Sequence, residues 1–495
     1  MGLLDVSGQL IRMSDAATIR FLLDGELIEI ADADPTRTVL QYLREDLRRK
    51  GTKEGCAEGD CGACTVVVAE LNPSSGAATL KAVNSCIQFL PTLDGKELIT
   101  VESLATGDEL HPVQSAMLRN HGSQCGFCTP GFVMSLYALY ETNPNPDRQD
   151  IDDALAGNLC RCTGYRPIIA AAMDMYATTP APARDRAAAL KNIRRDDSLA
   201  IEHDGRRFFA PRDANELAAL LTQYPDATLL AGGTDVGLWV TKQQRELETV
   251  IYTGRVHELA GVRVTGTHID IGGAATLTDV VPEIVRHYPG LDEMFRRFAS
   301  PPIRNAGTLG GNVANGSPIG DSMPALMVLD ATLVLRLGNV EREIAINDFY
   351  HDYMQNDLAP GEFVARIRIP LPADGAVVSS QKWSKRFDQD ISAVCTAYRL
   401  VLNRGRVTSF LMACGGLAAT VRRALHTEAA IVGQPWTRET IEKACEKLAA
   451  DFAPISDMRA SADIRLLAVQ NLLRRFHAET IDENLVTVYG YGRQR

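Results

Sequence analysis

Short apolar runs separated by turn residues mark the beginning of the chain. Residues 19–23 and 26–30 are two such runs on either side of Asp24-Gly25, a pair that favours a β-hairpin. Apolar residues then recur at helical spacing over residues 38–47, and Thr65–Val68 is a β-branched run typical of a strand. A hairpin, a helix and a further strand in this order predict a small β-grasp domain.

Residues 112–177 have a helical pattern instead. Thr129-Pro130 predicts a helix start, with the threonine as N-cap and the proline in the first turn, and this helix is expected to continue over Phe132–Tyr140. A second helix is expected over Asp150–Ala156, and a third from Arg166 to Tyr176. The sequence therefore predicts a helical domain after the β-grasp domain.

The second half of the chain mixes helical and strand patterns. Residues 178–198 are small, charged and interrupted by proline, as in a linker, with room for a short helix. The predicted helices cover Pro211–Gln223, Glu439–Ala449 and Ala462–His477, and the predicted strands cover Thr228–Ala231 and Val394–Leu402. These elements predict further domains of mixed α/β type.

Length and composition restrict the class of protein. The chain has 495 residues, enough for about three to four domains, and 45% of them are hydrophobic, which is ordinary for a globular protein. A net charge of −11 argues against a nucleic-acid partner, because such partners require a basic surface. No run approaches the roughly 20 apolar residues of a membrane span. Residues 1–15 resemble a loose leader without a signal peptide, so a cytoplasmic protein without a membrane partner is expected.

Eight of the eleven cysteines fall in two sets whose spacings suit iron–sulfur clusters. The first set has the C-x4-C-x2-C spacing of plant-type ferredoxins plus one distant cysteine, and the second pairs C-x2-C with a later C-x-C. In order, they are Cys56, Cys61, Cys64 and Cys86, then Cys125, Cys128, Cys160 and Cys162. Iron binds soft thiolates, usually four per cluster, so the chain is expected to hold two [2Fe–2S] clusters and to conduct electrons.

The surroundings of the cysteines favour this assignment. Gly55, Gly59 and Gly62 let the first loop bend and direct amide N–H groups towards sulfur. Both halves of the second set precede predicted helices, whose N-termini favour an anionic group. Zinc is the competing metal, because C-x2-C pairs also form zinc sites, whereas disulfides are not expected without a sign of export. The other cysteines are expected to be buried as small apolar side chains: Cys395, Cys414 and Cys445.

Two glycine-rich segments in the second half favour a nucleotide cofactor. Residues 231–237 follow a predicted strand, and residues 305–312 continue to a second polar segment at 317–321. Neither has the G-x-G-x-x-G pattern, so a Rossmann domain is not expected, and each alone could be an ordinary tight turn. Downstream of two iron–sulfur sets, they favour flavin, which accepts electrons one at a time. The polar run Lys382–Asp390 is expected to be an exposed loop.

These motifs resemble those of the molybdenum hydroxylases over nearly the whole chain. The resemblance is strongest to the small, iron–sulfur and flavin subunits of bacterial xanthine dehydrogenases. Residues 53–65, 122–131 and 157–165 resemble the two cluster signatures, and residues 309–312 with 317–321 resemble the FAD-binding part.

The resemblance implies an α+β multidomain fold. The implied domains are a β-grasp, plant-type ferredoxin-like domain over 16–100, a helical [2Fe–2S] domain over 101–177, a linker over 178–198, a two-part α/β FAD-binding domain of non-Rossmann type over 199–375, and a C-terminal α/β flavoprotein domain over 376–495.

The resemblance also implies cofactor contacts. The second cysteine set would hold the cluster nearer molybdenum, and the first set the cluster nearer FAD. Gln124 matches a residue that touches the pterin, although a surface glutamine is the simpler explanation. Phe298 matches an aromatic residue beside the flavin ring, and an ordinary core phenylalanine is the alternative. The loop over residues 385–390 matches a segment beside the flavin and NAD+ pocket. The implied FAD contacts are Leu230, Ala231, Gly232, Gly233, Thr234, Asp235, Phe298, Thr308, Asn312, Asp321 and Lys382.

In this family, substrate is hydroxylated at a molybdopterin-bound molybdenum, and electrons pass through the two clusters and FAD to NAD+. The molybdenum domain has no counterpart here, so the resemblance implies a large molybdopterin-binding partner subunit. A heterotetramer of two small and two large subunits is expected. The implied reaction oxidises hypoxanthine and xanthine to urate, with no catalytic residue for hydroxylation on this chain.

Three other interpretations stay open. The chain could serve a related aldehyde, carbon monoxide or N-heterocycle hydroxylase in the same role. It could be a flavin-free two-cluster electron carrier in which residues 199–495 act as an assembly scaffold. A zinc-binding module is the third possibility.

Overall fold

The computed structural model describes residues 18–177 and 184–482. The leader expected over residues 1–15, and the first part of the linker expected over 178–198, lie outside the described residues. None of the helices within the described ranges is long and apolar enough to cross a membrane.

The chain divides into two compact units. Unit 1 comprises residues 1–260 together with 300–308, and unit 2 comprises residues 261–299 together with 309–495. The FAD-binding domain expected over residues 199–375 therefore contributes to both units.

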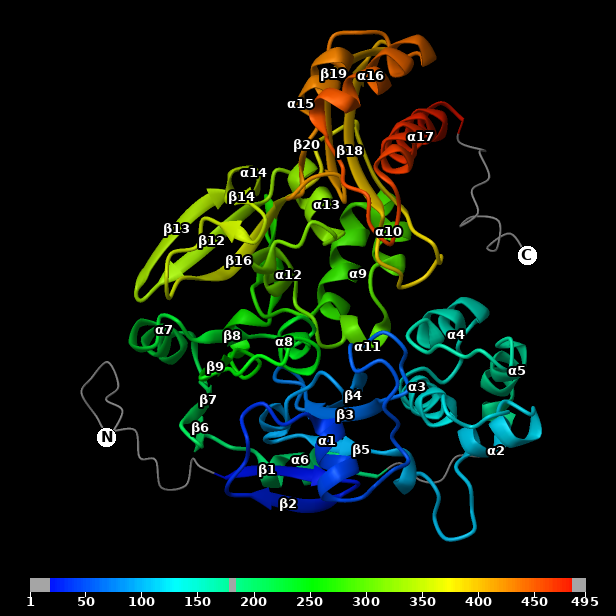
Figure 1. Ribbon diagram of the computed structural model, residues 1–495, viewed down its shortest axis with the longest axis vertical. Coiled ribbons are helices and arrows are strands. Elements are labelled where there is room, and N and C mark those ends of the chain that lie inside the picture. Colours follow the sequence, from blue (N-terminus) through cyan, green and yellow to red (C-terminus); the bar gives the residue numbers. More distant parts are fainter. Residues whose placement is uncertain (1–17, 178–183, 483–495) are drawn as a thin grey trace. The chain divides into compact units, whose positions relative to one another are not determined.

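A five-stranded sheet forms the N-terminal part of unit 1 (Figure 1, blue). Its strand order is β2-β1-β5-β3-β4, with β1 parallel to β5 and the other neighbours antiparallel. The strands are β1 (Ile19–Leu23), β2 (Glu26–Ile30), β3 (Thr65–Leu71), β4 (Ala78–Asn84) and β5 (Glu97–Ile99). The predicted hairpin is confirmed, because β1 and β2 pair in register on either side of Asp24-Gly25.

The helix predicted over residues 38–47 is present but irregular. It begins as α1 (Val39–Gln41) and continues as a π-helical turn over Tyr42–Asp46. The Thr38 side chain accepts a hydrogen bond from the Gln41 N–H, and the Gln41 side chain accepts one from the Thr38 N–H. This reciprocal capping fixes the start of the helix.

Both faces of β3 are buried over residues 65–69, which explains its unbroken apolar run. Successive strand residues point to opposite faces. Val66 and Val68 therefore belong to one core, whereas Val67 and Ala69 belong to the opposite core, which also contains Phe132. The sheet thus joins two cores of unit 1.

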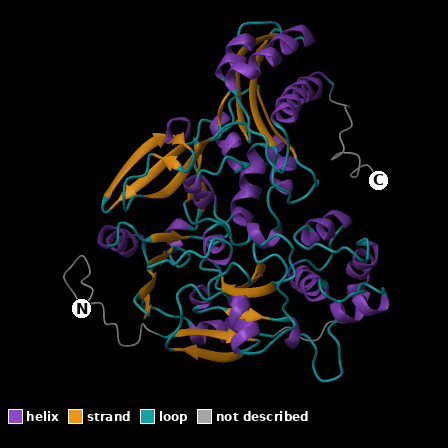
Figure 2. Cartoon of the chain, viewed as in Figure 1, coloured by secondary structure: helices purple, strands orange, loops and turns teal. Residues whose placement is uncertain are grey.

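The helical region that follows the sheet (Figure 2, purple) contributes most residues of one of these cores. Its helices are α2 (Pro112–Arg119), α3 (Thr129–Thr142), α4 (Arg148–Leu155) and α5 (Arg166–Asp174). The prediction of Thr129 as an N-cap is wrong, because Cys128 occupies the N-cap and Thr129 is already helical. The Thr129 hydroxyl donates instead to the Ser123 hydroxyl at 2.8 Å.

A second, four-stranded sheet completes unit 1. Its strand order is β6-β7-β9-β8, and β9 is parallel to both of its neighbours. The elements are α6 (Arg186–Ile193), β6 (Leu199–His203), β7 (Arg206–Ala210), α7 (Ala214–Gln223), β8 (Thr228–Leu230), α8 (Val236–Thr241), β9 (Thr249–Tyr252) and α11 (Pro301–Arg304). Phe208, Leu230 and Val250 of this sheet share a core with β1 and β3. The linker predicted over residues 178–198 contains one short helix, α6. Its Leu190 packs in the core of the helical region.

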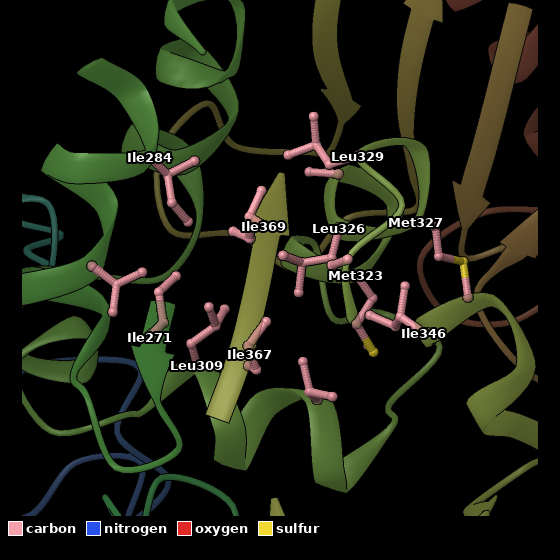
Figure 3. Close-up of a cluster of buried hydrophobic side chains, with 14 of the residues drawn as sticks. Ile271, Ile284, Leu309, Met323, Leu326, Met327, Leu329, Ile346, Ile367 and Ile369 are labelled. Atoms are coloured by element: carbon pink, nitrogen blue, oxygen red, sulfur yellow. The ribbon is translucent and has the colours of Figure 1, made fainter. Parts of the chain in front are cut away.

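Unit 2 begins with a five-stranded antiparallel sheet. Its order is β10-β11-β16-β12-β13. The strands are β10 (Val262–Val264), β11 (His268–Gly272), β12 (Thr332–Leu337), β13 (Val340–Ala345) and β16 (Phe363–Pro370), with the short pair β14 (Tyr350–Asp352) and β15 (Gln355–Asn356). The helices are α9 (Leu277–His287), α10 (Asp292–Arg297), α12 (Leu309–Asn315), α13 (Ser322–Val328) and α14 (Ile346–Phe349). Ile271 of β11 and Ile367 and Ile369 of β16 pack with Leu326 of α13 in a hydrophobic core (Figure 3).

The C-terminal part of unit 2 is a four-stranded sheet with three helices. The elements are β17 (Ala376–Trp383), β18 (Val394–Asn403), β19 (Arg406–Gly415), β20 (Arg422–Arg423), α15 (Leu425–Ile431), α16 (Arg438–Asp451) and α17 (Ala462–Ile481). Tyr398 of β18 stacks on Phe476 of α17 with ring centroids 4.5 Å apart. Cys395, Cys414 and Cys445 are buried here, as predicted.

Candidate electron-transfer centres

The first cysteine loop owes its shape to its glycines. Gly59 and Gly62 have positive φ angles of 77° and 69°, which L-residues with a side chain rarely adopt. A Cβ atom on Gly55 would lie 2.7 Å from the Cys61 sulfur, so this position has no room for a side chain. The Cys61 N–H donates to the Cys56 sulfur at 3.3 Å, as expected for a loop that directs amides towards sulfur.

The fold brings the four thiols of the first set together in two pairs. Contact with Cys61 lowers the pKa of Cys56 to about 5, and contact with Cys86 lowers the pKa of Cys64. The pKa values of Cys61 and Cys86 rise correspondingly, because each of these thiols donates to its partner. Each pair therefore holds one sulfur with a lowered pKa, which favours the thiolate form in which sulfur binds iron.

The second set forms two further pairs, Cys125 with Cys162 and Cys128 with Cys160. Contact with Cys125 raises the pKa of Cys162, whereas burial and contact with Cys160 raise the pKa of Cys128 to about 12. Burial also raises the pKa of Cys160, but hydrogen bonding to Thr163, at 3.2 Å, outweighs it and the net pKa is lowered. The predicted placement is confirmed, because one half of the set precedes α3 and the other precedes α5.

The paired arrangement fits a two-iron cluster. In a [2Fe–2S] cluster four thiolates are shared between two irons, so two sulfur pairs are required. Within residues 18–177 and 184–482, no group of three or more histidine, cysteine or acidic side chains is placed to hold a single metal ion. The two sulfur pairs of each set meet this requirement of a [2Fe–2S] cluster.

The two sets differ in exposure. Cys64 and Cys86 are buried, whereas Cys125 and Cys162 are exposed. Phe127, which lies between Cys125 and Cys128, is 48% exposed, and Gln124 is exposed beside Cys125. The second set is thus at the surface of unit 1, and the role of Gln124 stays a prediction.

The glycine turn after β8 packs against a second backbone segment. A Cβ atom on Gly232 would lie 1.9 Å from the Ala306 carbonyl oxygen, and Gly233 has a φ of 72°. Thr234 packs against Gly307: a Cβ atom added to Gly307 would lie 3.3 Å from the Thr234 hydroxyl. Leu230 is buried at the end of β8, and Ala231 leads into the turn. Only glycine at position 232 permits this close approach of two backbones.

The helix after this turn, α8, lies on the first cysteine loop. The Thr241 hydroxyl donates to the Ala57 carbonyl at 2.8 Å, and the Lys242 ammonium donates to the Cys56 carbonyl at 2.8 Å. A Cβ atom on Gly237 would lie 2.5 Å from the Ile87 carbonyl oxygen, next to Cys86. The glycine turn and the first cysteine set are therefore parts of one packed structure.

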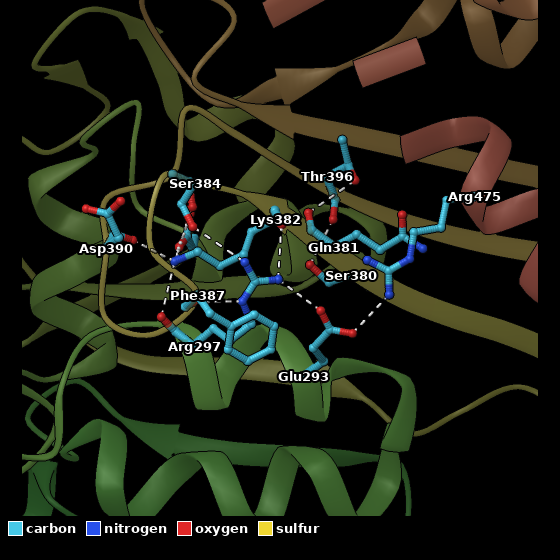
Figure 4. A network of polar contacts seen from close by, with 12 residues as sticks. Glu293, Arg297, Ser380, Gln381, Lys382, Ser384, Phe387, Asp390, Thr396 and Arg475 are labelled. Carbon is cyan, nitrogen blue, oxygen red and sulfur yellow. Dashed lines mark hydrogen bonds and ion pairs between the residues drawn. The ribbon is translucent and has the colours of Figure 1, made fainter. Parts of the chain in front are cut away.

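In unit 2, the buried polar network shown in Figure 4 includes Lys382 and extends to Asp321. The expectation of an exposed loop from residue 382 is wrong for its first residue, because Lys382 belongs to β17 and is 3% exposed. Its ammonium donates to Asp321 at 2.8 Å and to the carbonyls of Asp390 and Arg297 at 2.9 and 3.2 Å. The positive charge is thus neutralised and its three protons are used.

The two carboxylate oxygens of Asp321 differ in their hydrogen bonding. Its Oδ2 accepts from Lys382 and from the Ser392 hydroxyl at 2.8 Å, while Oδ1 is buried without a hydrogen-bond partner among the described residues. A buried carboxylate oxygen normally has a donor, and a cofactor hydroxyl could supply one. Nearby in sequence, the Asn312 amide oxygen accepts from the Ser322 hydroxyl at 2.6 Å.

The remaining predicted FAD contacts have less specific surroundings. Phe298 is partly buried and packs against the apolar core of unit 2. Thr308 is buried in unit 1, and Asp235 accepts a hydrogen bond from the Trp239 indole at 3.0 Å. Their contact with a flavin stays a prediction.

Trp383 is the last residue of β17, and residues 384–390 form a loop of exposed and half-buried residues that α10 anchors. The Arg297 guanidinium lies over the Phe387 ring, 4.3 Å from its centroid, and donates to the Phe387 carbonyl at 3.0 Å. The Asp390 carboxylate accepts from the Arg386 N–H at 2.9 Å and closes the loop.

Sequence reasoning missed several residues of these centres. Asn158 lies within residues 157–165, which resemble a cluster signature, but nothing in the sequence pattern assigns it a role. Thr241 and Lys242 lie in no recognisable motif. Arg297 gave no signal either, since its partners come from a distant part of the chain.

Four known domain families together account for most of the chain. Residues 21–88 match a 2Fe-2S iron-sulfur cluster binding domain, and residues 100–173 match a [2Fe-2S] binding domain. Residues 202–372 match the FAD binding domain in molybdopterin dehydrogenase, and residues 379–480 match the CO dehydrogenase flavoprotein C-terminal domain. The chain belongs to the molybdenum hydroxylase family. Both [2Fe–2S] domains and the FAD-binding domain are therefore confirmed, and so is the α+β multidomain fold.

Molybdenum hydroxylases of several specificities are similar to the chain. Xanthine dehydrogenase of Emericella nidulans is 32% identical over 88% of the chain and 36% of its own length. Aldehyde oxidase 1 of Bos taurus is 28% identical over 94% of the chain and 40% of its own length. The chain thus spans little more than a third of the length of such curated relatives.

Solved structures of molybdenum hydroxylases are also similar to part of this chain. A chain of carbon monoxide dehydrogenase from Hydrogenophaga pseudoflava is 29% identical with a TM-score of 0.52, covering 54% of this chain and 94% of that one. A chain of reconstituted CO dehydrogenase from Oligotropha carboxidovorans is 28% identical with a TM-score of 0.51, covering 54% and 94%. The chain is therefore an iron–sulfur and flavin electron-transfer component of a molybdenum hydroxylase.

Proposed function

We propose that this chain is the electron-transfer subunit of an NAD+-dependent xanthine dehydrogenase. When bound, the two clusters and FAD would carry electrons from a molybdopterin centre on a large partner subunit to NAD+, during oxidation of hypoxanthine and xanthine to urate. A heterotetramer of two small and two large subunits is part of the proposal.

The observation that carries the proposal is the continuous packing of three cofactor segments in unit 1. The Leu159 N–H donates to the Cys61 carbonyl at 3.0 Å, which joins the second cysteine set to the first. Lys242 then joins the Cys56 carbonyl to the helix that follows the glycine turn. Direct hydrogen bonds thus link each segment to the next, as electron transfer between the bound cofactors would require.

Exposure gives the direction. The exposed pair Cys125 and Cys162 faces outward, where a partner subunit could approach, and we assign it to the cluster that receives electrons from molybdenum. The buried pair Cys64 and Cys86 lies further in and is assigned to the cluster that passes electrons to FAD. Exposed Phe127 and Gln124 would lie against the partner, with Gln124 near the pterin.

The flavin contacts are proposed from local structure. In unit 1, Gly232 and Gly233 form a tight, half-buried turn, and the backbone amides of such a turn could approach a pyrophosphate closely. In unit 2, the unpartnered Oδ1 of Asp321 is an acceptor for a ribityl or ribose hydroxyl, and Lys382 holds that carboxylate in place.

The test uses the complex purified from its native host by a tag on this chain. We expect xanthine-dependent formation of NADH, and a large subunit that copurifies with molybdopterin. The chain purified alone and loaded with cofactors should oxidise NADH with an artificial acceptor but not oxidise xanthine. Oxidation of xanthine by a preparation free of any partner would contradict the proposed division of labour.

A related hydroxylase is the second candidate, because residues 379–480 match a CO dehydrogenase flavoprotein domain. The same complex is therefore assayed with an aldehyde, carbon monoxide and nicotinate. Activity with one of these and none with xanthine would keep the electron-transfer role and change the substrate. The match to a FAD-binding domain favours both candidates over a flavin-free carrier, and flavin extraction with iron and sulfide analysis would test that preference.

A further inference from the structure

One buried amide lies where the two cysteine loops meet. Asn158 is 2% exposed and precedes the loop that carries Cys160 and Cys162. Its Nδ2 donates to the Gly62 carbonyl at 3.1 Å and lies 3.3 Å from the Thr65 hydroxyl. Its Oδ1 accepts from the Ser135 hydroxyl of α3 at 2.6 Å. A single side chain therefore binds the loop of the first set and the main helix of the second.

The backbones beside Asn158 approach so closely that the glycines at positions 62 and 131 have no room for a side chain. A Cβ atom on Gly62 would lie 2.2 Å from the Gly157 carbonyl oxygen, and one on Gly131 would lie 2.1 Å from the Gly62 carbonyl oxygen. Gly62 is thus enclosed by two segments of the helical domain. The glycines allow the approach, whereas the hydrogen bonds of Asn158 determine where it stops.

This contact leads directly to cluster ligands on both sides. The Leu159 N–H, next to Asn158, donates to the Cys61 carbonyl at 3.0 Å, and Cys160 follows Leu159 in the chain. One hydrogen bond and one intervening residue therefore separate a ligand position of the first set from one of the second.

We propose that Asn158 is a positioning residue that sets the distance and orientation between the two iron–sulfur clusters. The inference rests on the proposed function, since both cysteine sets must hold clusters. Asn158 acts through the Cys61–Cys64 loop and not by touching a cluster atom. The primary amide of Asn158 donates to Gly62 and accepts from Ser135, whereas aspartate would lose the donor and leucine would lose both groups.

The test is electron paramagnetic resonance on the full chain with both clusters reduced. Two reduced clusters held close together interact magnetically, and the resulting splitting depends on their distance and orientation. Wild-type protein is expected to give one spin per cluster and a resolved splitting. Asn158→Asp and Asn158→Leu are expected to keep both spins and to lose or clearly reduce the splitting, because the loops separate or rotate.

A matched control separates positioning from charge and from general destabilisation. Asn72→Asp adds the same negative charge to the same unit, in an exposed turn where Asn72 Oδ1 accepts from Ser74 and Ser75 amides, and should keep the wild-type splitting. A positioning role predicts a change shared by the neutral and the charged variant of Asn158, which an effect of charge alone would not give.

Other outcomes overturn the proposal. Wild-type splitting in both Asn158 variants would show that the loops hold their positions without the amide. Loss of one cluster from both variants would assign Asn158 to the assembly of a single cluster instead. Wild-type protein without two reducible clusters would refute the proposed function and the inference with it.

Discussion

Two lysines show how much the surroundings of a residue decide. Lys382 is enclosed with Asp321, and the exposed fractions of the two side chains are 1% and 3%. Lys242 lies at a rim, with 44% of its side chain exposed, and its ammonium binds the Cys56 carbonyl and lies 3.5 Å from Glu58. We therefore expect Lys382 to affect the stability of the fold, and Lys242 to affect the reduction potential of the cluster held by the first cysteine set.

Replacing Lys242 with methionine is expected to lower the reduction potential of the cluster held by the first cysteine set. A nearby positive charge stabilises the reduced, more negative cluster, so its loss makes reduction harder. An interaction of about 1 kcal/mol, typical of charges in water, corresponds to about 40 mV for one electron. A redox titration followed by electron paramagnetic resonance measures the shift. Lys385→Met, an exposed lysine of unit 2, is the control, and equal potentials in both variants would contradict the prediction.

Replacing Lys382 with methionine is expected to destabilise the sheet of β17 and β18 by about 3–5 kcal/mol, because the Asp321 carboxylate is left buried and unpaired. The double variant Lys382→Met with Asp321→Leu should recover most of the loss, since neither charge remains. Hydrogen exchange of the two strands in flavin-free protein measures the free energy of opening.

The control for this pair is Arg399→Met, which removes a more exposed ion pair with Asp330. Exposed pairs contribute about 0–1 kcal/mol, so this variant should change little. An equal loss in the Lys382 and Arg399 variants would show that burial of the first pair has no special consequence.

At the scale of elements, the start of α2 depends on a neutral histidine. His111 Nδ1 accepts a hydrogen bond from the Val113 N–H at 3.3 Å, and the His111 ring contacts Tyr137 and Tyr140 edge to face. Burial, and then the charge of Arg186, lowers the pKa of His111 to about 4. A protonated imidazole could not accept from the helix, so the cap is lost when the residue becomes charged.

The helical region is therefore expected to lose stability as the pH falls from about 6.5 to about 4. In this window the unfolded histidine, with a pKa of about 6.5, binds a proton that the folded one does not. His111→Asn keeps a capping oxygen that does not titrate, so its stability should fall less over the same window. Thermal unfolding measured across this range tests the difference. His121→Asn, at an exposed position, is the control, and identical pH profiles for the wild type and His111→Asn would refute the role of His111.

At the scale of the whole molecule, unit 1 is held together by contacts between segments far apart in the sequence. Arg195 donates to Asp94 at 2.9 Å, and both side chains are almost fully buried. Arg186 of α6 donates to the Tyr137 hydroxyl at 2.6 Å. The β6–β9 sheet shares its core with the ferredoxin-like sheet, so the cluster domains and the following segment fold as one body.

A chain cleaved at a protease site introduced between residues 178 and 183 is therefore expected to stay associated. The two fragments should elute together in gel filtration, because separating them would expose the shared core and the Arg195–Asp94 pair. Adding Arg195→Met should weaken the association and release fragments at low concentration. Separate elution of the fragments without that substitution would contradict the shared core.

Local patterns were enough to predict many of the elements. The hairpin at Asp24-Gly25 and the helix over Ala462–Ile481 follow from turn chemistry and periodicity, which act over a few residues. The N-cap of α3 was misplaced by one residue, because Thr129 bonds to Ser123 instead of to its own helix. Lys382 was expected in an exposed loop, since a lysine carries no mark of the distant aspartate that allows its burial.

By itself the sequence determined that this protein holds two sulfur-rich sites and a glycine turn. Cysteine spacing and glycine conformation are local properties, so they can be read along the chain. Only the tertiary structure decided which thiols pair, that Asn158 binds both cysteine loops, and that Lys242 reaches Cys56. The reason is physical: these contacts join residues many positions apart, and the energy that selects them comes from close packing and burial, which leave no periodic trace in the sequence.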